Sequence, residues 1–289
     1  MIKIKKAVIP AAGWGTRFFP MTKAQPKEML PVVDKPVIQY VVEEAIASGC
    51  DDILIITGKN KRAIEDHFDS SPELDAYLEM RGNLELLTAS RDLENLADIH
   101  FIRQKEPKGL GDAILCAKQH VGDEPFAVLL GDTICLPDAG QKPCTAQLAS
   151  IYEVKNRPVI GVEQVSHQKI EDYGIIDGDK IDDRLYSIRH IIEKPAISDA
   201  PSDIGIIGRY ILTPEIFSHL EKTGPGKFGE VQLSDALNKY QALLGYSPAS
   251  VRYDVGDMDG WIKTNVRLLL QHPRYGQTLK AELQNTGHR

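Results

Sequence analysis

A glycine-rich segment near the start of the chain carries the first residues that could do chemistry. The segment AAGWGTRFFPMTKAQPKEML follows the apolar run KAVIP and contains the basic residues Arg17, Lys23 and Lys27. Glycines let a backbone approach a ligand closely, and backbone N–H groups can bind phosphate oxygens. The segment lacks the G-K-[ST] ending of a P-loop, and Phe18 stands where a dinucleotide-binding fingerprint has its third glycine. It therefore indicates a phosphate site of another kind, although a G-x-G pair alone is as typical of an ordinary tight turn.

A second candidate lies where another buried strand is predicted to end. Asp132 comes directly after FAVLLG, and open α/β sheets bind their ligands at the carboxyl ends of the strands. The segment YDVGD near the C-terminus offers two further carboxylates, Asp254 and Asp257, although Asp254 also suits a turn ahead of Gly256.

The elements that must position these residues alternate between strands and helices. In the first half, strands are predicted over 6–12, 52–57, 99–103 and 126–130. Helices are predicted over 36–49 and 61–68, as two pieces of a surface excursion within 72–98, and within 109–120. This alternation favours an α/β fold with a parallel sheet and crossover helices.

From Pro158 onward the pattern is looser and predicts a mixed extension of the sheet with antiparallel strands. The segments VIGVEQV, SIRHIIEKP and DIGIIGRYIL are strand-like, and DYGIIDGDK is rich in turn residues. Helices are predicted over 231–244 and 259–271, on either side of a last strand SVRYDV, and over 275–285 at the C-terminus. No repeat or low-complexity segment interrupts the chain, so one domain spanning 1–289 is predicted.

Composition limits the classes of function. Lys and Arg number 34 against 41 Asp and Glu, a net charge of -7, which argues against a broad nucleic-acid surface. Four scattered cysteines without a C-x-x-C pair, no signal peptide and no apolar run of about 18 residues predict a cytoplasmic protein with no membrane partner. The eight histidines include no H-E-x-x-H pair, and we interpret them as ordinary surface or supporting residues.

The motifs together resemble a known enzyme family. G-x-G-T-R-x-x-P-x-T-K followed by P-K-E-M-L-P is similar to the signature loop of bacterial and archaeal UTP–glucose-1-phosphate uridylyltransferases. The likeness continues in the family's order through D-K-P-x-I-Q-Y-V-V-E-E-A, R-Q-K-E-P-x-G-L-G, I-I-E-K-P, I-G-R-Y-I-L, G-E-V-Q-L-S-D-A-L and Y-D-V-G-D. It implies the nucleotide-diphospho-sugar transferase fold, a Rossmann-like α/β fold whose mixed, mostly parallel sheet has helices on both faces. It also implies uridylyl transfer from UTP to glucose 1-phosphate with Mg²⁺, giving UDP-glucose and pyrophosphate. The enzyme implied is a homo-oligomer, either a dimer or a tetramer.

The resemblance assigns roles residue by residue. A nucleotide-binding half, 1–135, precedes a half for the sugar phosphate with the C-terminal helices, 136–289. The catalytic cations implied are Arg17, Lys27 and Lys194. The nucleotide-binding residues implied are Ala11, Ala12, Gly13, Gly15, Thr16, Glu28, Gln104 and Gly109, with Gln104 reading uracil. Sugar binding falls to Gly174, Glu193 and Lys194. Asp132 and Asp254 are the implied Mg²⁺ ligands, with Asp257 as the alternative to Asp254.

Some positions depart from the family pattern. Trp14 stands where leucine is common, Met21 where a small residue is usual, and Asp112 where histidine is common. None of these changes removes a proposed charged residue, but they bear on the choice of base and sugar. Three alternatives remain open: a thymidylyltransferase acting on the same sugar phosphate, a non-catalytic paralogue that regulates a uridylyltransferase, and an oxidoreductase, which the missing third glycine argues against.

Overall fold

The computed structural model describes residues 3–226 and 229–286. Its centre is a nine-stranded sheet in the order β5-β4-β1-β6-β11-β8-β12-β10-β9. The strands are β1 (Lys6–Pro10), β4 (Asp52–Thr57), β5 (Asp98–Arg103), β6 (Phe126–Leu129), β8 (Val159–Gln164), β9 (Gly174–Lys180), β10 (Leu185–Glu193), β11 (Ile204–Leu212) and β12 (Leu243–Tyr246).

The sheet is mixed, with four parallel and four antiparallel pairs of neighbouring strands in its order. Strands β5, β4, β1 and β6 run parallel to one another, and β8 runs parallel to β12. Strand β11 is antiparallel to both β6 and β8, and β10 is antiparallel to β12 and β9. Because β11 pairs with β6, a single sheet connects the chain before residue 135 with the chain after it.

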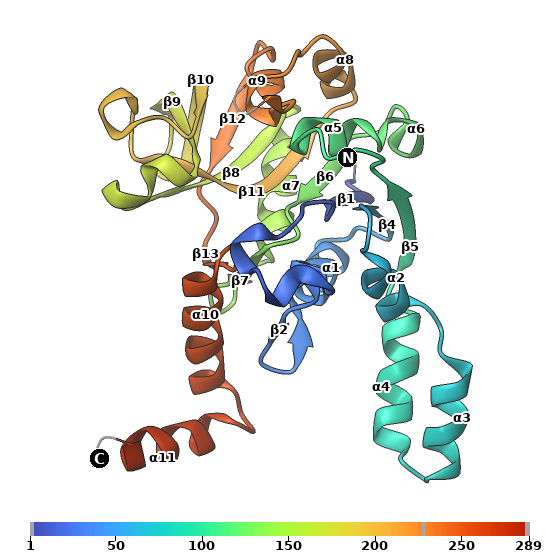
Figure 1. The fold of residues 1–289 in the computed structure, drawn as a ribbon. Helices are drawn as coiled ribbons and strands as arrows, with labels where there is room; N and C mark the ends of the chain where they lie inside the picture. Colours follow the sequence, from blue (N-terminus) through green and yellow to red (C-terminus); the bar gives the residue numbers. More distant parts are fainter. Residues whose placement is uncertain (1–2, 227–228, 287–289) are drawn as a thin grey trace.

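Helices cover both faces of the sheet (Figure 1). One face packs against α1 (Val37–Ala47), α2 (Arg62–Phe68) and α7 (Cys144–Lys155), and the other against α5 (Leu110–Leu115), α6 (Lys118–Val121), α8 (Glu215–Glu221) and α9 (Leu233–Leu237). Successive residues of one strand alternate between the two cores: Ile53 and Ile55 of β4 face α1, whereas Leu54 and Ile56 face α5. Parallel strands buried on both faces need such continuous apolar runs.

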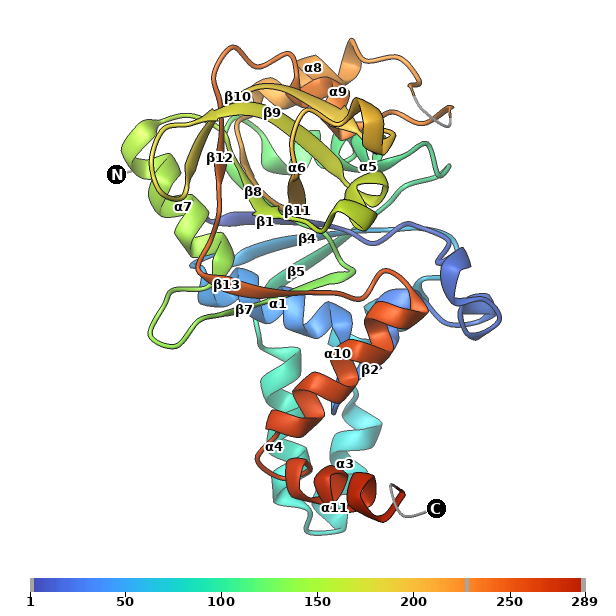
Figure 2. The same ribbon diagram turned by 90° about the vertical axis from the view of Figure 1, so that its left-hand side faces the viewer.

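Two helical arms project from this body in the same direction (Figures 1 and 2). One consists of α3 (Pro72–Met80) and α4 (Leu84–Glu94), and the other of α10 (Met258–Gln271) and α11 (Gly276–Thr286). The shorter elements are β2 (Pro31–Val32), β3 (Lys35–Pro36), β7 (Thr133–Pro137), β13 (Ser250–Asp254) and the 3-10 helices η1 (Thr16–Phe18), η2 (Met21–Lys23), η3 (Lys27–Met29), η4 (His167–Asp172) and η5 (Ile197–Asp199).

Most predicted elements are confirmed, but the helix predicted over 231–244 is wrong. Helix α9 ends at Leu237, and residues 243–246 form β12 instead. Leu244 pairs with Val159 on one side and Ser187 on the other, so sheet pairing overrides the helical pattern. The turn-rich segment DYGIIDGDK contains a full strand, β9. Strand β7 and helix α7 were not predicted.

The cysteines and helices of the described residues add two facts. Cys50, Cys116, Cys135 and Cys144 are all free thiols. No helix within 3–226 or 229–286 has the length and apolar character needed to cross a membrane.

Candidate active site

The loop after β1 is held beside the carboxyl end of β4. Ala11 N donates to Ile56 O at 2.8 Å, and the chain then leaves the sheet. Gly15 has a φ of 67°, a left-handed conformation that favours glycine. A Cβ at Gly15 would also lie 3.2 Å from Lys27 Cβ, and Thr22 Oγ1 donates to Gly15 O at 2.7 Å. Backbone conformation and close packing therefore both require the glycine that the sequence pattern identified.

Lys27 and Asp132 form an ion pair at this edge of the sheet. Lys27 Nζ lies 2.5 Å from Asp132 Oδ2, and the two side chains are only 19% and 28% exposed. Burial by itself would lower the pKa of Lys27, but the carboxylates of Asp132 and Glu28 raise it. Burial would likewise raise the pKa of Asp132, but Lys27 and then Arg17 lower it. Both groups are therefore charged at neutral pH, and the loop's lysine meets the carboxylate that follows β6.

Asp132 and Asp254 come together because the segments next to them pair. Asp254 pairs with Thr133 in the antiparallel β7–β13 ladder. Gly256 lies between the polar groups: a Cβ on it would be 3.1 Å from Asp254 Oδ1, 3.6 Å from Arg17 Nη1 and 3.7 Å from Asp132 Oδ2. Two carboxylates and a guanidinium from three distant parts of the sequence therefore converge on one small space.

Neighbouring polar groups hold Asp254 in a fixed orientation. Tyr173 Oη donates to Asp254 Oδ2 at 2.5 Å, and Arg252 Nη1 lies 3.3 Å from the same oxygen. Gly256 N donates to Asp254 Oδ1 at 3.0 Å. Burial, followed by the negative charge of Asp254, raises the pKa of the Tyr173 hydroxyl, so Tyr173 remains a neutral donor. Asp254 thus presents a positioned carboxylate next to Asp132.

Asp257, the alternative to Asp254, has a different position. Its Oδ1 accepts a hydrogen bond from Gly260 N at 2.8 Å and caps the N-terminus of α10. Such a cap satisfies a helix N–H that has no partner within the helix. Asp254 therefore lies close to Asp132, whereas the carboxylate of Asp257 caps a helix.

A first cavity, of about 520 Å³, opens between the glycine-rich loop and the start of α5. That volume is in the range of small-molecule sites. The predicted residues in its lining are Ala12, Gly13, Gly15, Thr16, Lys27, Glu28, Gln104, Gly109 and Asp132. Ala11 is 1% exposed, so it lies beneath the loop rather than at the cavity surface. One cavity thus brings together almost all of the predicted nucleotide-binding residues.

Gln104 lies in this cavity with its amide already oriented. Its Nε2 donates to Asp112 Oδ2 at 2.7 Å and to Gly109 O at 3.3 Å, and its side chain is nearly buried. Gly109 has a φ of 104°, and a Cβ there would lie 2.8 Å from Glu230 Cβ. Asp112, one of the departures from the family pattern, therefore fixes the direction of the Gln104 amide.

A second cavity, of about 260 Å³, lies against β9, β10 and β11. Its lining includes the predicted residues Arg17, Asp132, Gly174, Glu193, Lys194 and Asp254. The resemblance implied that Arg17 is a catalytic cation alongside Lys27, and in the structure Arg17 lines this second cavity whereas Lys27 lines the first. The lining carries both basic and acidic side chains, so it suits a polar ligand better than an apolar one.

The sugar-side residues of the second cavity come from the β9–β10 hairpin. Gly174 pairs with Glu193, and a Cβ on Gly174 would lie 3.2 Å from Glu193 Oε2. Lys194 has a φ of 45°, unusual for a residue with a side chain, and its N donates to Tyr173 O at 3.0 Å. Backbone strain of this kind tends to occur at functional sites. The hairpin therefore places Glu193 and Lys194 together at the end of β10.

The structure adds two residues that the sequence did not single out. Glu230 lines both cavities; its place in the G-E-V-Q block was the available signal. Lys61 is nearly buried and its Nζ lies 2.7 Å from Glu28 Oε2, so Glu28 has a buried counter-ion. The basic residues near the start of α2 resemble an ordinary exposed surface in the sequence, so the pairing of Lys61 with Glu28 could not be predicted.

The two cavities adjoin beside the carboxyl end of β6, and Asp132 lines both of them. The chain belongs to the nucleotidyl transferase family, whose model matches residues 6–270.

Among curated proteins, the chain is similar to UTP–glucose-1-phosphate uridylyltransferases over nearly its full length. It is 53% identical to the one from Bacillus subtilis (strain 168), covering 94% of this chain and 93% of the relative. It is 51% identical to UTP–glucose-1-phosphate uridylyltransferase 2 from Streptococcus pyogenes serotype M3, covering 99% and 97%. These relatives confirm the resemblance that the sequence motifs indicated.

Solved structures give the same result. A UTP-bound UGPase from Acinetobacter baumannii matches with a TM-score of 0.90 and 36% identity, over 97% of this chain and 99% of that one. A UDP-glucose pyrophosphorylase complexed with UDP-glucose matches with a TM-score of 0.84 and 41% identity, over 93% and 100%. A glucose-1-phosphate thymidylyltransferase from Bacillus anthracis is 23% identical with a TM-score of 0.70, a likeness of fold. The predicted fold class is therefore confirmed.

Proposed function

We propose that this chain is a UTP–glucose-1-phosphate uridylyltransferase that forms UDP-glucose and pyrophosphate. One observation carries the assignment of substrates to the site. The first and second cavities share four lining residues, Leu110, Leu130, Asp132 and Glu230. A nucleotide in the first cavity and a sugar phosphate in the second would therefore bring their phosphates together beside Asp132.

The reaction needs charge neutralisation more than a protein base. A phosphate oxygen of glucose 1-phosphate attacks the α-phosphorus of UTP, the bond from that phosphorus to the bridging oxygen breaks, and pyrophosphate leaves. The attacking oxygen is already anionic, so positioning and electrostatic stabilisation supply the catalysis. Lys27, held at the edge of the first cavity, would bind the triphosphate and stabilise the departing pyrophosphate. Lys194 would neutralise the sugar phosphate, and Arg17 would add positive charge between the two.

The residues around Gly256 fit a magnesium ion. Mg²⁺ prefers oxygen ligands and is usually held by one or two carboxylates together with substrate phosphates. Asp132 and Asp254 offer two such carboxylates around one small residue. When bound there, the ion would offset negative charge on the phosphoryl oxygens. We therefore assign Asp132 and Asp254 as its ligands.

The uracil base contacts Gln104 and Gly109 in the first cavity. Because Gln104 Nε2 is held by Asp112 and by the Gly109 carbonyl, its Oε1 remains to accept the ring N–H of uracil. Gly109, which has no side chain, lets the base approach the backbone of the turn. The sugar hydroxyls fall to Glu193, whose carboxylate lies against Gly174 in the second cavity.

Release of pyrophosphate tests the proposal directly. We expect it from a mixture of UTP, glucose 1-phosphate and Mg²⁺, and we expect it to stop when any one of the three is left out or when EDTA is added. Initial rates with dTTP and ATP separate the alternatives. A rate with dTTP above that with UTP would make the protein a thymidylyltransferase, and no release under any condition would favour a non-catalytic paralogue.

We also propose that the protein is a homo-oligomer that acts in the cytoplasm. The two projecting arms expose large apolar side chains, among them Leu74, Tyr77 and Met80 on α3 and Ile262 and Val266 on α10. Exposed apolar residues that gather on one element are typical of protein interfaces. Light scattering of the purified protein would give its mass, and a monomer would contradict the proposal.

A further inference from the structure

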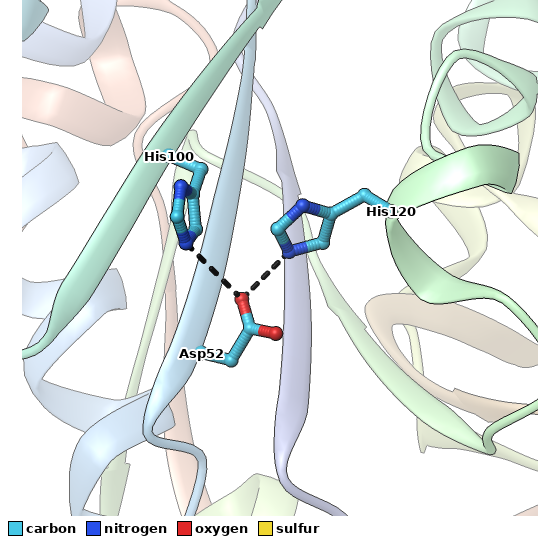
Figure 3. A group of neighbouring side chains, drawn as sticks. All are labelled: Asp52, His100 and His120. Carbon is cyan, nitrogen blue, oxygen red and sulfur yellow. Dashed lines mark hydrogen bonds and ion pairs between the residues drawn. The ribbon is translucent and has the colours of Figure 1, made fainter.

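A cluster of two histidines and an aspartate lies near the amino ends of β4 and β5, whereas the candidate active site lies at the carboxyl ends of the parallel strands. Asp52 begins β4, His100 is in β5 and His120 is in α6, and the three side chains point toward one another (Figure 3). Asp52 pairs in register with Lys6, the first residue of β1, so the cluster lies at the amino ends of these strands. The sequence reading of the histidines as ordinary residues therefore missed a cluster that only the fold assembles.

The three side chains are close enough to share one ion. His120 Nε2 lies 2.6 Å from Asp52 Oδ1, and His100 Nε2 lies 3.9 Å from the same oxygen. All three ligand atoms lie within 4.8 Å of one another. Ligand atoms of a tetrahedral zinc site are about 3.3 Å apart, given bonds of about 2.0 Å. Small side-chain rotations, closing the long distances and opening the short one, would bring the three to that spacing.

The backbone around the cluster is well anchored. Lys6 Nζ donates to His120 O at 3.2 Å and to Val121 O at 3.1 Å, which fixes the end of α6 against β1. Glu124 Oε1, 2.7 Å from the same ammonium, neutralises the lysine charge next to the cluster. The side chains of Asp52 and His120 are 29% and 19% exposed, so the cluster is partly shielded but open to an entering ion.

The chemistry of the donors selects the kind of ion. Imidazole nitrogens suit zinc and neighbouring transition metals, whereas Mg²⁺ prefers an all-oxygen set. Two imidazoles with one carboxylate form a ligand set found in zinc proteins, in which water takes the fourth position. Asp98 Oδ1, 3.4 Å from His100 Nε2, adds a further negative charge at the rim.

We propose that Asp52, His100 and His120 form a second metal site that binds one divalent transition-metal ion, with Zn²⁺ as the representative. The site joins β4, β5 and α6, and none of its ligands lines either cavity of the active site. An ion bound there contacts three elements of the folded chain that separate on unfolding. The ion therefore raises the free energy of unfolding. It takes no part in nucleotidyl transfer, which we assign to the two cavities.

Zinc binding to protein without a histidine tag tests the proposal. Zn²⁺ is titrated in competition with a chromogenic chelator, in excess Mg²⁺, for the parent protein and for His100→Ala, His120→Ala and Asp52→Asn. We expect one Zn²⁺ per chain in the parent and affinity lower by about tenfold or more in each variant, since even supporting residues of metal sites have effects of that size. His272→Ala is the matched control, because His272 Nε2 lies 3.5 Å from Asp34 Oδ2 and His272 belongs to no cluster of three candidate ligands within the described residues. It should bind Zn²⁺ like the parent.

Thermal unfolding gives a second measurement that does not depend on the chelator. Zn²⁺ should raise the melting temperature of the parent and of His272→Ala, and the rise should be absent in His100→Ala. His100 is nearly half exposed, so that variant is expected to fold. Co²⁺ should give the visible absorption of a four-coordinate site in the parent and lose it in His120→Ala. Equal zinc affinity in the parent and the cluster variants, or no zinc bound by the parent, would overturn the proposal and leave a hydrogen-bonded histidine–aspartate pair.

Discussion

The guanidinium of Arg209 forms a buried ion pair with the carboxylate of Glu44, next to the candidate active site. Arg209 Nη2 lies 2.7 Å from Glu44 Oε2, and Arg209 is fully buried. The same guanidinium donates to Thr133 O at 2.7 Å and to Leu130 O at 3.4 Å. These two carbonyls flank Asp132 in the sequence. The ion pair between α1 and β11 therefore supports the backbone turn that carries Asp132, a proposed metal ligand.

Replacing Arg209 by Met should destabilise the protein by about 3–5 kcal/mol, because Glu44 would remain buried without a counter-ion. Urea unfolding of the variant measures the loss. The double variant Glu44→Gln/Arg209→Met should recover part of it, since no unpaired charge would then remain. A double variant as unstable as the two single changes added together would show that the residues act independently.

Asp132→Asn should lower turnover by orders of magnitude while the melting temperature changes little. Asparagine has nearly the size of aspartate and can still accept a hydrogen bond from Lys27, and the carboxylate of Glu28 remains near the lysine charge. Activity loss would come from the charge at the point where the two cavities meet. Pyrophosphate release and a thermal scan of the same preparation test both expectations, and an Asp132→Asn protein with parental turnover would refute the role.

Replacing Asp254 and Asp257 in turn by asparagine should distinguish their roles. Asp254→Asn should reduce turnover strongly and raise the Mg²⁺ concentration required for half-maximal rate, because it removes a proposed ligand. Asp257→Asn should retain activity and stability, since asparagine caps a helix about as well as aspartate. Mg²⁺ titrations of both variants decide the assignment, and the reverse pattern would move the metal ligand to Asp257.

The two lysines should have separable effects. Lys194→Ala should raise the KM for glucose 1-phosphate, because it removes a point charge from the second cavity. Lys27→Ala should instead weaken use of UTP and lower kcat, since the lysine lies in the first cavity beside Asp132. Steady-state kinetics with each substrate varied in turn give the four constants. Were Lys194→Ala to change only the KM for UTP, the roles would be reversed.

Gln104→Ala should lower kcat/KM for UTP by about ten- to a hundredfold, corresponding to about 1–3 kcal/mol for a polar group left unpaired. Asp112→Ala should have a smaller effect in the same direction, because it frees the Gln104 amide to rotate without removing it. In the parent we expect UTP to be used best, dTTP next and purine nucleotides hardly at all. Unchanged UTP efficiency in Gln104→Ala would mean that the base is read elsewhere.

The sequence by itself determined the first four parallel strands of the sheet, the glycine-rich loop and the family. The strands β4 and β6 are buried on both faces of the sheet, and their sequences are continuous apolar runs. The sequence pattern therefore predicts both the strand and its burial. Gly15 was identifiable for the same reason, because its left-handed backbone is a local requirement. The order of the motifs along the chain also led to the prediction that Lys27, Asp132 and Asp254 serve one reaction.

Only the tertiary structure decided which distant groups meet. The segment at Leu244 has a helical pattern, yet it forms β12 because its neighbours β8 and β10 supply hydrogen-bond partners. The pairing of Arg209 with Glu44, of Lys61 with Glu28 and of His120 with Asp52 joins residues far apart in the chain. Charge and imidazole chemistry carry no local periodicity, so contacts of this kind are set by the packing of whole elements and leave no pattern in the sequence.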